Sequence, residues 1–313
     1  MLIATSKRQL QLMLGELVAK ATEAGLKVHS GKTKVMSNDV SNRGGLLKFE
    51  GGVVDVLPFS GSTSYLGREL CFEDAHDVEI ASRINKAWKK FFVLKPDLCG
   101  KHVSLRCRLK LFNATVTPTL LYGSGSWTMT AERERILRST QRRMLRWMLG
   151  SFWKRPADEG SQVEEASDSS CSSSEFPEPA EEDPSEDREE EKLEQETWVE
   201  WIRRCTRVVE EQLGRASIDD WVVTQRRRKW RLAGHTARRD DNRWSETLLG
   251  WQPPYSNRGR GYPCKRWTND LDAYFYHIDG APRWVWKAVA LNRERWQALE
   301  ERFVSQLLAY FGE

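Results

Sequence analysis

Residues 104–150 read SLRCRLKLFNATVTPTLLYGSGSWTMTAERERILRSTQRRMLRWMLG and decide the fold class, because apolar residues recur in them at helical spacing. One helix is expected to begin near Ser104 and to stop at Pro118, whose ring is incompatible with a continuing helix. Its apolar stripe consists of Leu105, Leu109, Phe112 and Val116. A second helix is expected to begin after Thr130 and to end at Gly150, and its apolar face contains Leu137, Met144 and Met148.

The residues before this segment combine helix and strand signals. The S-x-x-Q pattern of Ser6–Gln9 is typical of a helix start, and Gly25 stands where that helix should end. The apolar runs Leu46–Phe49 and Val53–Leu57 are joined by a Gly-Gly pair, which indicates a β-hairpin. One further short strand is expected at Ser64–Leu70.

More helices are expected on both sides of residues 104–150. One runs from Asp77, and its shared face consists of Val78, Ala81, Ile84, Trp88 and Phe91. The others lie at about 197–213, 217–232, 242–250 and 282–311, with a basic loop at Ser256–Lys265 between the last two. Because strand-like runs precede residue 71 and helical patterns follow it, the predicted class is α+β, mainly helical.

The charge is divided unevenly along the chain. The 313 residues contain 49 Lys and Arg and 45 Asp and Glu, for a net charge of +4, but residues 157–197 contain 17 acidic and two basic side chains. That segment has almost no large apolar side chains, so it is expected to be a disordered acidic linker. The rest of the chain is strongly basic, and phosphate backbones are the expected partners of such a surface. Solvated helix faces are the alternative interpretation.

Several classes of protein are excluded. No apolar run approaches the length of a membrane span, and the N-terminus lacks the pattern of a secretory signal. The six cysteines form no C-x-x-C pair, which argues against a disulfide framework or a zinc ribbon. We therefore expect an intracellular protein, nuclear or cytoplasmic, with no membrane partner.

Several stretches, taken in order, resemble parts of one known family. They are MLIATSKRQLQLMLGELVAKATEAGL (1–26), GLKVHSGKTKVM (25–36), SYLGREL (64–70), TVTPTLLYGSGSWTMTAERERILRSTQRRMLRWMLG (115–150), RRRKWRLAGHTARRDDNRW (226–244) and RGRGYPCKRWTNDL (258–271). Together they resemble the downstream part of a reverse transcriptase, an RNA-directed DNA polymerase, encoded by a non-LTR (LINE-like) retrotransposon. The first two resemble the palm after its Asp-Asp motif, the third the primer grip, the fourth the thumb, and the last two the C-terminal tail.

The resemblance implies a domain order. It consists of a palm remnant with a primer-grip-like hairpin (1–72), a helical thumb-like region (73–156), the disordered acidic linker (157–197) and a Trp/Arg-rich helical C-terminal unit (198–313).

The resemblance also implies that the catalytic aspartates would precede Met1. Glu16, Glu23 and Asp39 form no paired-carboxylate constellation. Polymerases of this kind hold two metal ions with carboxylates, so Mg²⁺ is expected only in a full-length parent enzyme. We therefore expect a fragment that binds template–primer nucleic acid, as RNA–DNA or DNA duplex, without catalysing synthesis. No cofactor and no small-molecule substrate are expected for these residues.

Two motifs carry roles implied by the resemblance. Lys32 matches the palm lysine that approaches the triphosphate, so it is a candidate accessory residue, although it could equally be an ordinary surface lysine. Tyr65, Leu66 and Gly67 match the turn that positions the primer end. The structural alternative is that Tyr65 and Leu66 are core residues of a strand, and both interpretations can hold together.

Two basic groups are candidate nucleic-acid contacts. Arg135, Arg138, Arg142 and Arg146 recur at i, i+3, i+7 and i+11, which makes a continuous stripe along the helix that ends at Gly150. We expect these arginines to contact the phosphates of a duplex backbone; a solvated helix face that pairs with the acidic linker is the alternative. Arg226, Arg227, Arg228 and Lys229 form a short cluster that could be a nuclear localisation signal or a phosphate patch.

Other candidate sites are weaker. Trp230, Trp244, Trp251 and Trp267 could stack on bases, but core packing is the favoured role. Cys205, His235, Cys264 and His277 are too irregularly spaced to predict a zinc site, so no metal site is expected. The alternatives to a reverse-transcriptase remnant are a stand-alone nucleic-acid-binding protein and an interaction scaffold that uses the acidic linker as a tether.

Overall fold

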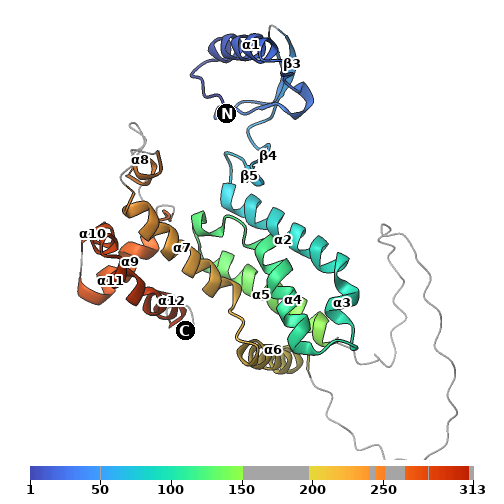
Figure 1. The fold of residues 1–313 in the computed structure, drawn as a ribbon, viewed down its shortest axis with the longest axis vertical. Helices are drawn as coiled ribbons and strands as arrows, with labels where there is room; N and C mark the ends of the chain where they lie inside the picture. Colours follow the sequence, from blue (N-terminus) through green and yellow to red (C-terminus); the bar gives the residue numbers. More distant parts are fainter. Residues whose placement is uncertain (50, 151–196, 240–243, 251–264, 281, 310–313) are drawn as a thin grey trace, which may run out of the picture.

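The computed structural model describes residues 1–49, 51–150, 197–239, 244–250, 265–280 and 282–309. Figure 1 shows a small α/β unit at the N-terminus, a short hairpin below it, and a larger helical body with a C-terminal helical unit at its side. The α+β, mainly helical class is confirmed. The predicted acidic linker lies outside the described residues except for Thr197, and the predicted basic loop lies outside them except for Lys265.

The N-terminal unit packs one helix on a three-stranded sheet. Its elements are α1 (Lys7–Glu23), η1 (Ser30–Lys32), β1 (Lys34–Val35), β2 (Gly45–Phe49) and β3 (Gly52–Val56). The strand order is β1-β3-β2, with β1 and β3 parallel and β2 and β3 antiparallel. Leu14 of α1 is buried against Leu47 and Val54, which are cross-strand partners.

Local signals set the ends of these elements as predicted. The Ser6 hydroxyl accepts the Gln9 backbone N–H at 3.2 Å, and Gly25 follows the helix in the left-handed region with φ +72°. The Gln9 side chain departs from a strict capping box, because its Oε1 accepts the backbone N–H of Thr5. The β2–β3 hairpin confirms the strand pair that the Gly-Gly sequence predicts.

The predicted strand at Ser64–Leu70 is wrong as a single strand. The segment is a hairpin of β4 (Thr63–Tyr65) and β5 (Arg68–Leu70), which pair antiparallel with Tyr65 opposite Arg68. The chain reverses at Leu66 and Gly67, where φ is +48° and +78°. Two successive residues with positive φ are what a tight hairpin turn requires, because that backbone matches the twist of the strands.

The helical body has one continuous apolar core. Its elements are α2 (Ala75–Val93), α3 (Lys95–Cys99), α4 (Leu105–Leu120), η2 (Ser124–Ser126), α5 (Ala131–Leu149) and α6 (Trp198–Arg215), together with the first half of α7 (Trp221–Ala237). The core therefore crosses residue 198, where the sequence suggested a boundary, because Val209 of α6 and Trp221 of α7 are buried in it.

Two sequence expectations for this body need correction. The buried face of α2 contains Glu79, Ile80, Arg83, Ala87 and Phe91, so of the five predicted residues only Phe91 is buried. Pro118 does not stop α4, which continues to Leu120. Pro118 lies in the last turn, where its missing N–H costs one hydrogen bond, while Leu120 beyond it is fully buried. The α5 bounds and its face of Leu137, Met144 and Met148 are confirmed.

The C-terminal unit is a second core around the distal half of α7. It contains α8 (Trp244–Gly250), α9 (Asn269–Asp279), α10 (Val285–Leu291), α11 (Arg293–Ala298) and α12 (Glu300–Ala309). The predicted single helix at 282–311 is wrong, because the chain breaks at Asn292, whose side chain caps α11, and again at Leu299. Sequence reasoning also missed α9. The core is aromatic and includes Trp230, Tyr274, Phe275, Trp286, Trp296 and Phe303.

Candidate nucleic-acid interface

The β4–β5 turn presents its side chains to solvent. Leu66 is 76% exposed and Tyr65 is 42% exposed, so the interpretation of these residues as strand core is wrong. Leu66 has the left-handed backbone that a branched side chain adopts only at a cost, and Gly67 continues it. The turn is therefore held in a conformation that needs support from the rest of the protein.

That support comes from buried charges on α2. The Arg83 guanidinium donates to the carbonyl of Gly67 and, through Nε, to Glu79 at 2.9 Å. The other oxygen of Glu79 accepts the backbone N–H of Glu69 at 2.6 Å. The Arg83 and Glu79 side chains are 7% and 0% exposed. Because desolvated charges are costly unless fully paired, this pair is a specific device that joins the hairpin to α2.

A second support comes from the end of α4. The Tyr122 hydroxyl donates to the carbonyl of Leu66 at 3.2 Å, and the Arg83 guanidinium lies 4.5 Å from the centre of the Tyr122 ring. Both carbonyls of the turn are therefore bound by the helical body. Sequence reasoning missed Glu79, Arg83 and Tyr122; the acid–base pair at i and i+4 was the only local signal for them.

Lys32 lies apart from this turn in the architecture. It is an exposed residue of η1 in the N-terminal α/β unit, next to β1. Its neighbour Lys34 pairs with Asp55 across the parallel strands at 2.5 Å. The accessory role of Lys32 stays a prediction.

Three of the four arginines of the stripe on α5 contact carboxylates. Arg135, 71% exposed, pairs with Glu132 on its own helix. Arg138 lies 3.7 Å from Asp220 at the start of α7, and Arg142 lies 2.5 Å from Glu210 on α6. Arg146 is half-buried, and burial lowers the pKa of its guanidinium. The alternative of a fully solvated face is therefore wrong, because only the N-terminal end of the stripe is open, and its contact with phosphates stays a prediction.

The basic cluster at the centre of α7 is also engaged inside the protein. Arg226 binds Glu134 of α5 through two oxygens at 2.8 and 2.9 Å, and Lys229 binds Asp270 of α9 at 2.5 Å. Arg226 and Lys229 are buried, and desolvation lowers the pKa of the Lys229 ammonium. The cluster is therefore not a contiguous surface patch, because helical periodicity turns two of its four side chains inward.

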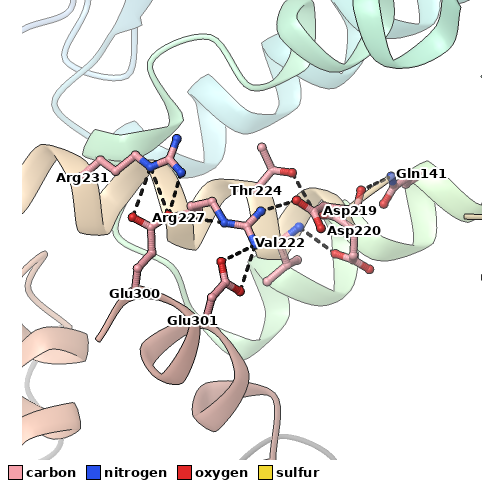
Figure 2. Close-up of polar contacts among 9 residues, drawn as sticks. All are labelled: Gln141, Asp219, Asp220, Val222, Thr224, Arg227, Arg231, Glu300 and Glu301. Atoms are coloured by element: carbon pink, nitrogen blue, oxygen red, sulfur yellow. Dashed lines mark hydrogen bonds and ion pairs between the residues drawn. The ribbon is translucent and has the colours of Figure 1, made fainter. Parts of the chain in front are cut away.

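Figure 2 shows the outward side of the same helix. Arg227 lies between Asp219, which precedes α7, and Glu301 of α12, and Arg231 contacts Glu300. Arg228 donates to the carbonyl of Leu121. The cluster thus ties α7 to α4, α5, α9 and α12.

The described residues also include an open basic surface that sequence reasoning missed. We define the aromatic–basic surface as Trp88 and Phe92 of α2, Lys95 of α3, and Arg143 and Trp147 of α5. The three rings have centroids 5.6 to 6.3 Å apart. Arg143 lies 5.7 Å above the Trp88 ring and Lys95 lies 5.2 Å above the Trp147 ring. Phe92 is 49% exposed, so the cluster is accessible.

The other sequence candidates fall mainly into structural roles. Trp230 is in the C-terminal core, as favoured, and Trp267 donates to the carbonyl of Gly125 at 2.8 Å. Trp244 is 77% exposed, and Trp251 lies outside the described residues.

The four zinc candidates do not come together in the described part of the chain. Cys205 is buried, His235 and His277 are exposed, and Cys264 lies outside that part. Within it, no three His, Cys, Asp or Glu side chains gather where they could hold a metal ion. None of its helices has the length and apolar character of a membrane span. Cys71, Cys99, Cys107 and Cys205 are free thiols.

Comparison with known proteins identifies one similarity along nearly the whole chain. No family model matches the sequence, and no solved structure matches it. A transposon-derived protein of Caenorhabditis elegans is 26% identical to it over 303 residues, which cover 96% of this chain and 92% of that protein. The similarity therefore supports an origin of this chain in a transposable element.

Proposed function

We propose that this transposon-derived chain is a remnant of a non-LTR retrotransposon reverse transcriptase that binds a template–primer duplex without itself catalysing synthesis. The observation that carries the proposal is the exposed Leu66–Gly67 turn, both of whose carbonyls are bound by Arg83 and Tyr122 of the helical body.

The energetics of the turn favour a positioning role. A hairpin that only closed the chain would not need a buried ion pair, because taking two charges out of water is costly. Once formed, the pair holds the hairpin firmly, since removing one partner costs about 3–5 kcal/mol. Here the buried Glu79 and Arg83 bind each other and the hairpin, and Arg83 also lies against the Tyr122 ring that supports the turn. The arrangement places a rigid backbone and an exposed Leu66 side chain at a fixed position relative to α2, as a primer grip requires.

The charge of the surrounding region supports a polyanionic ligand. Residues 1–156 contain 26 Lys and Arg and 13 Asp and Glu. The aromatic–basic surface includes two rings of α2, the helix that also holds the turn, and adds Lys95 of α3 and Arg143 of α5. Phosphate contacts along one helix would fix a duplex in register without reading its sequence.

The test introduces one negative charge at the turn. In Leu66→Asp, the new side chain tolerates the left-handed backbone of this position, and its negative charge should repel phosphates. Leu66→Asn introduces a side chain of the same shape without the charge. We expect the Asp variant to lower the affinity for a labelled RNA–DNA primer–template about tenfold at low salt, and the Asn variant to change it less than threefold. Fluorescence anisotropy with the full chain measures both affinities.

A matched control separates the turn from net charge. Leu291→Asp adds the same charge at a position that is 64% exposed on α10, in the C-terminal unit. If Leu291→Asp weakens duplex binding as much as Leu66→Asp, or if neither variant differs from the parent, the turn is not part of a nucleic-acid interface and the proposal is wrong.

A further inference from the structure

The C-terminal unit contains a cavity that the proposed duplex interface does not use. Its volume is about 650 Å³, within the range of roughly 300–1,000 Å³ that small-ligand sites occupy. Its lining residues come from α9 and its flanking residues. In Figure 1, α9 and α10 lie well away from β4 and β5. The residues that define the chemistry of the cavity are Arg266, Asn269, Asp272, Tyr276, Arg283 and Trp284.

The lining is positively charged. Arg266 and Arg283 are exposed, and neither has a carboxylate within ion-pair distance among the described residues. Asp272, the acidic residue of the lining, instead accepts the backbone N–H of Trp284 at 2.9 Å. Two guanidinium groups at one cavity are suited to a phosphate, because their planar forks bind its oxygens in pairs.

The lining also offers aromatic rings. Tyr276 is 64% exposed, and Trp284 has φ +70°, a left-handed backbone that is rare for a bulky residue. The hydrogen bond to Asp272 holds Trp284 in that conformation at the cavity, where its half-buried ring also packs against Trp286 of the C-terminal core. A phosphate site beside the exposed Tyr276 ring is the combination that binds unstacked nucleotides.

We propose that this cavity binds one nucleotide of a single-stranded nucleic acid, with its phosphate on Arg266 and Arg283 and its base against Tyr276. A duplex cannot use the site, because its bases are paired and stacked and present only their edges. The inference therefore goes beyond the proposed function and adds a second, independent contact for an unpaired strand.

The test uses the full chain and a labelled ten-nucleotide oligouridine. The double variant Arg266→Gln with Arg283→Gln should lower the affinity for oligouridine about tenfold. It should also flatten the slope of log K against log salt by about 1.4, because each lost phosphate contact on a single strand removes about 0.7 from the slope. Tyr276→Ala should lower the affinity at least fivefold. Arg293→Gln with Arg295→Gln removes the same charge from exposed positions of α11 and should change the affinity less than twofold.

Two competitors identify the source of the nucleotide. Displacement of the labelled strand by millimolar uridine monophosphate means that a free nucleotide suffices; displacement only by unlabelled strand means that the neighbouring nucleotides are required. The proposal is wrong if the α11 control weakens binding as much as the pocket variant does. It is also wrong if hexaglutamate displaces the strand as well as oligouridine, which would assign the cavity to acidic peptides.

Measuring each variant with both ligands, oligouridine and the primer–template duplex, separates this inference from the duplex proposal. The pocket variants should leave primer–template affinity within twofold, and Leu66→Asp should leave oligouridine affinity within twofold. If the pocket variants bind oligouridine as the parent does, while Leu66→Asp loses duplex binding, the proposed nucleotide site is wrong and the duplex proposal stands.

Discussion

Trp230 and Trp296 bind each other reciprocally in the C-terminal core. The indole N–H of each donates to the backbone carbonyl of the other, at 3.0 and 3.1 Å, and the rings stack with centroids 3.7 Å apart. The pair joins α7 to α11 and satisfies two buried donors at once, which explains why these tryptophans are core residues and not stacking surfaces for bases.

Gly234 is required by this pair. A Cβ at Gly234 would lie 2.4 Å from Nε1 of Trp296, so Gly234→Ala should lower the free energy of unfolding by about 1–3 kcal/mol. The control is Gly214→Ala on α6, where a Cβ meets nothing within 4 Å and should stabilise the helix by about 0.5–1 kcal/mol. Urea unfolding measures both; a shift of the same sign in the two variants would contradict the packing argument.

The Glu134–Arg226 pair should behave as a coupled unit. Its side chains are 7% and 3% exposed. Arg226→Gln alone should cost about 3–5 kcal/mol, because it leaves a buried carboxylate without its partner. Adding Glu134→Gln should recover at least about 1 kcal/mol of that loss. A double-mutant cycle in urea measures the coupling, and simple additivity of the two costs would show that the pair is not coupled.

The arginine stripe should divide into binding and structural positions. Arg135→Gln should leave stability within about 0.5 kcal/mol and flatten the salt slope of duplex binding by about 0.9, because its guanidinium can exchange Glu132 for a phosphate. Arg138→Gln should instead lower stability, since Asp220 also caps α7 through the N–H of Val222. Anisotropy titrations at several salt concentrations, paired with unfolding curves, test this. Equal effects of both variants on the slope would mean that the whole stripe binds nucleic acid.

His76 should make the protein less stable in mild acid. Burial lowers the pKa of His76 below its ordinary value of 6.5, and Arg133 and Arg68 lower it further against the opposing effect of Asp77. The unfolded chain therefore takes up a proton as the pH falls through about 6.5, whereas the folded chain resists it, so the free energy of unfolding should fall between pH 7.5 and 5.5. The slope should stay below about 1.4 kcal/mol per pH unit, the limit for one proton.

Two variants isolate this effect. His76→Gln should reduce the pH dependence of the urea midpoint, and His235→Gln, at an exposed position, should preserve it. A parent protein whose midpoint does not change between pH 7.5 and 5.5 would refute the assignment.

Purified residues 1–313 should not extend a primer. The aspartates that the resemblance requires for two-metal catalysis do not lie within these residues, and losing them removes the main stabilisation of the transition state. Extension of a labelled primer with magnesium or manganese, above a control without protein, would disprove this.

Helix ends and the first hairpin were readable from the sequence because their signals are local. Ser6 and Thr130 accept N–H groups three residues away, and Gly150 ends α5 in the left-handed region that a glycine adopts freely. The β2–β3 hairpin is likewise set by neighbouring residues around its two glycines. These contacts need no knowledge of the rest of the chain.

Only the tertiary structure decided which charged side chains are buried and which partners they bind. Arg226 and Glu134 are 92 residues apart in the sequence. No local pattern predicts that Arg226, one of four consecutive basic residues, is buried against Glu134. The same holds for Arg83, whose partner Gly67 lies on a hairpin. A basic stripe or cluster has the same sequence whether it meets solvent or a carboxylate on another helix, because the free energy of burying a charge depends on the partner that folding brings to it.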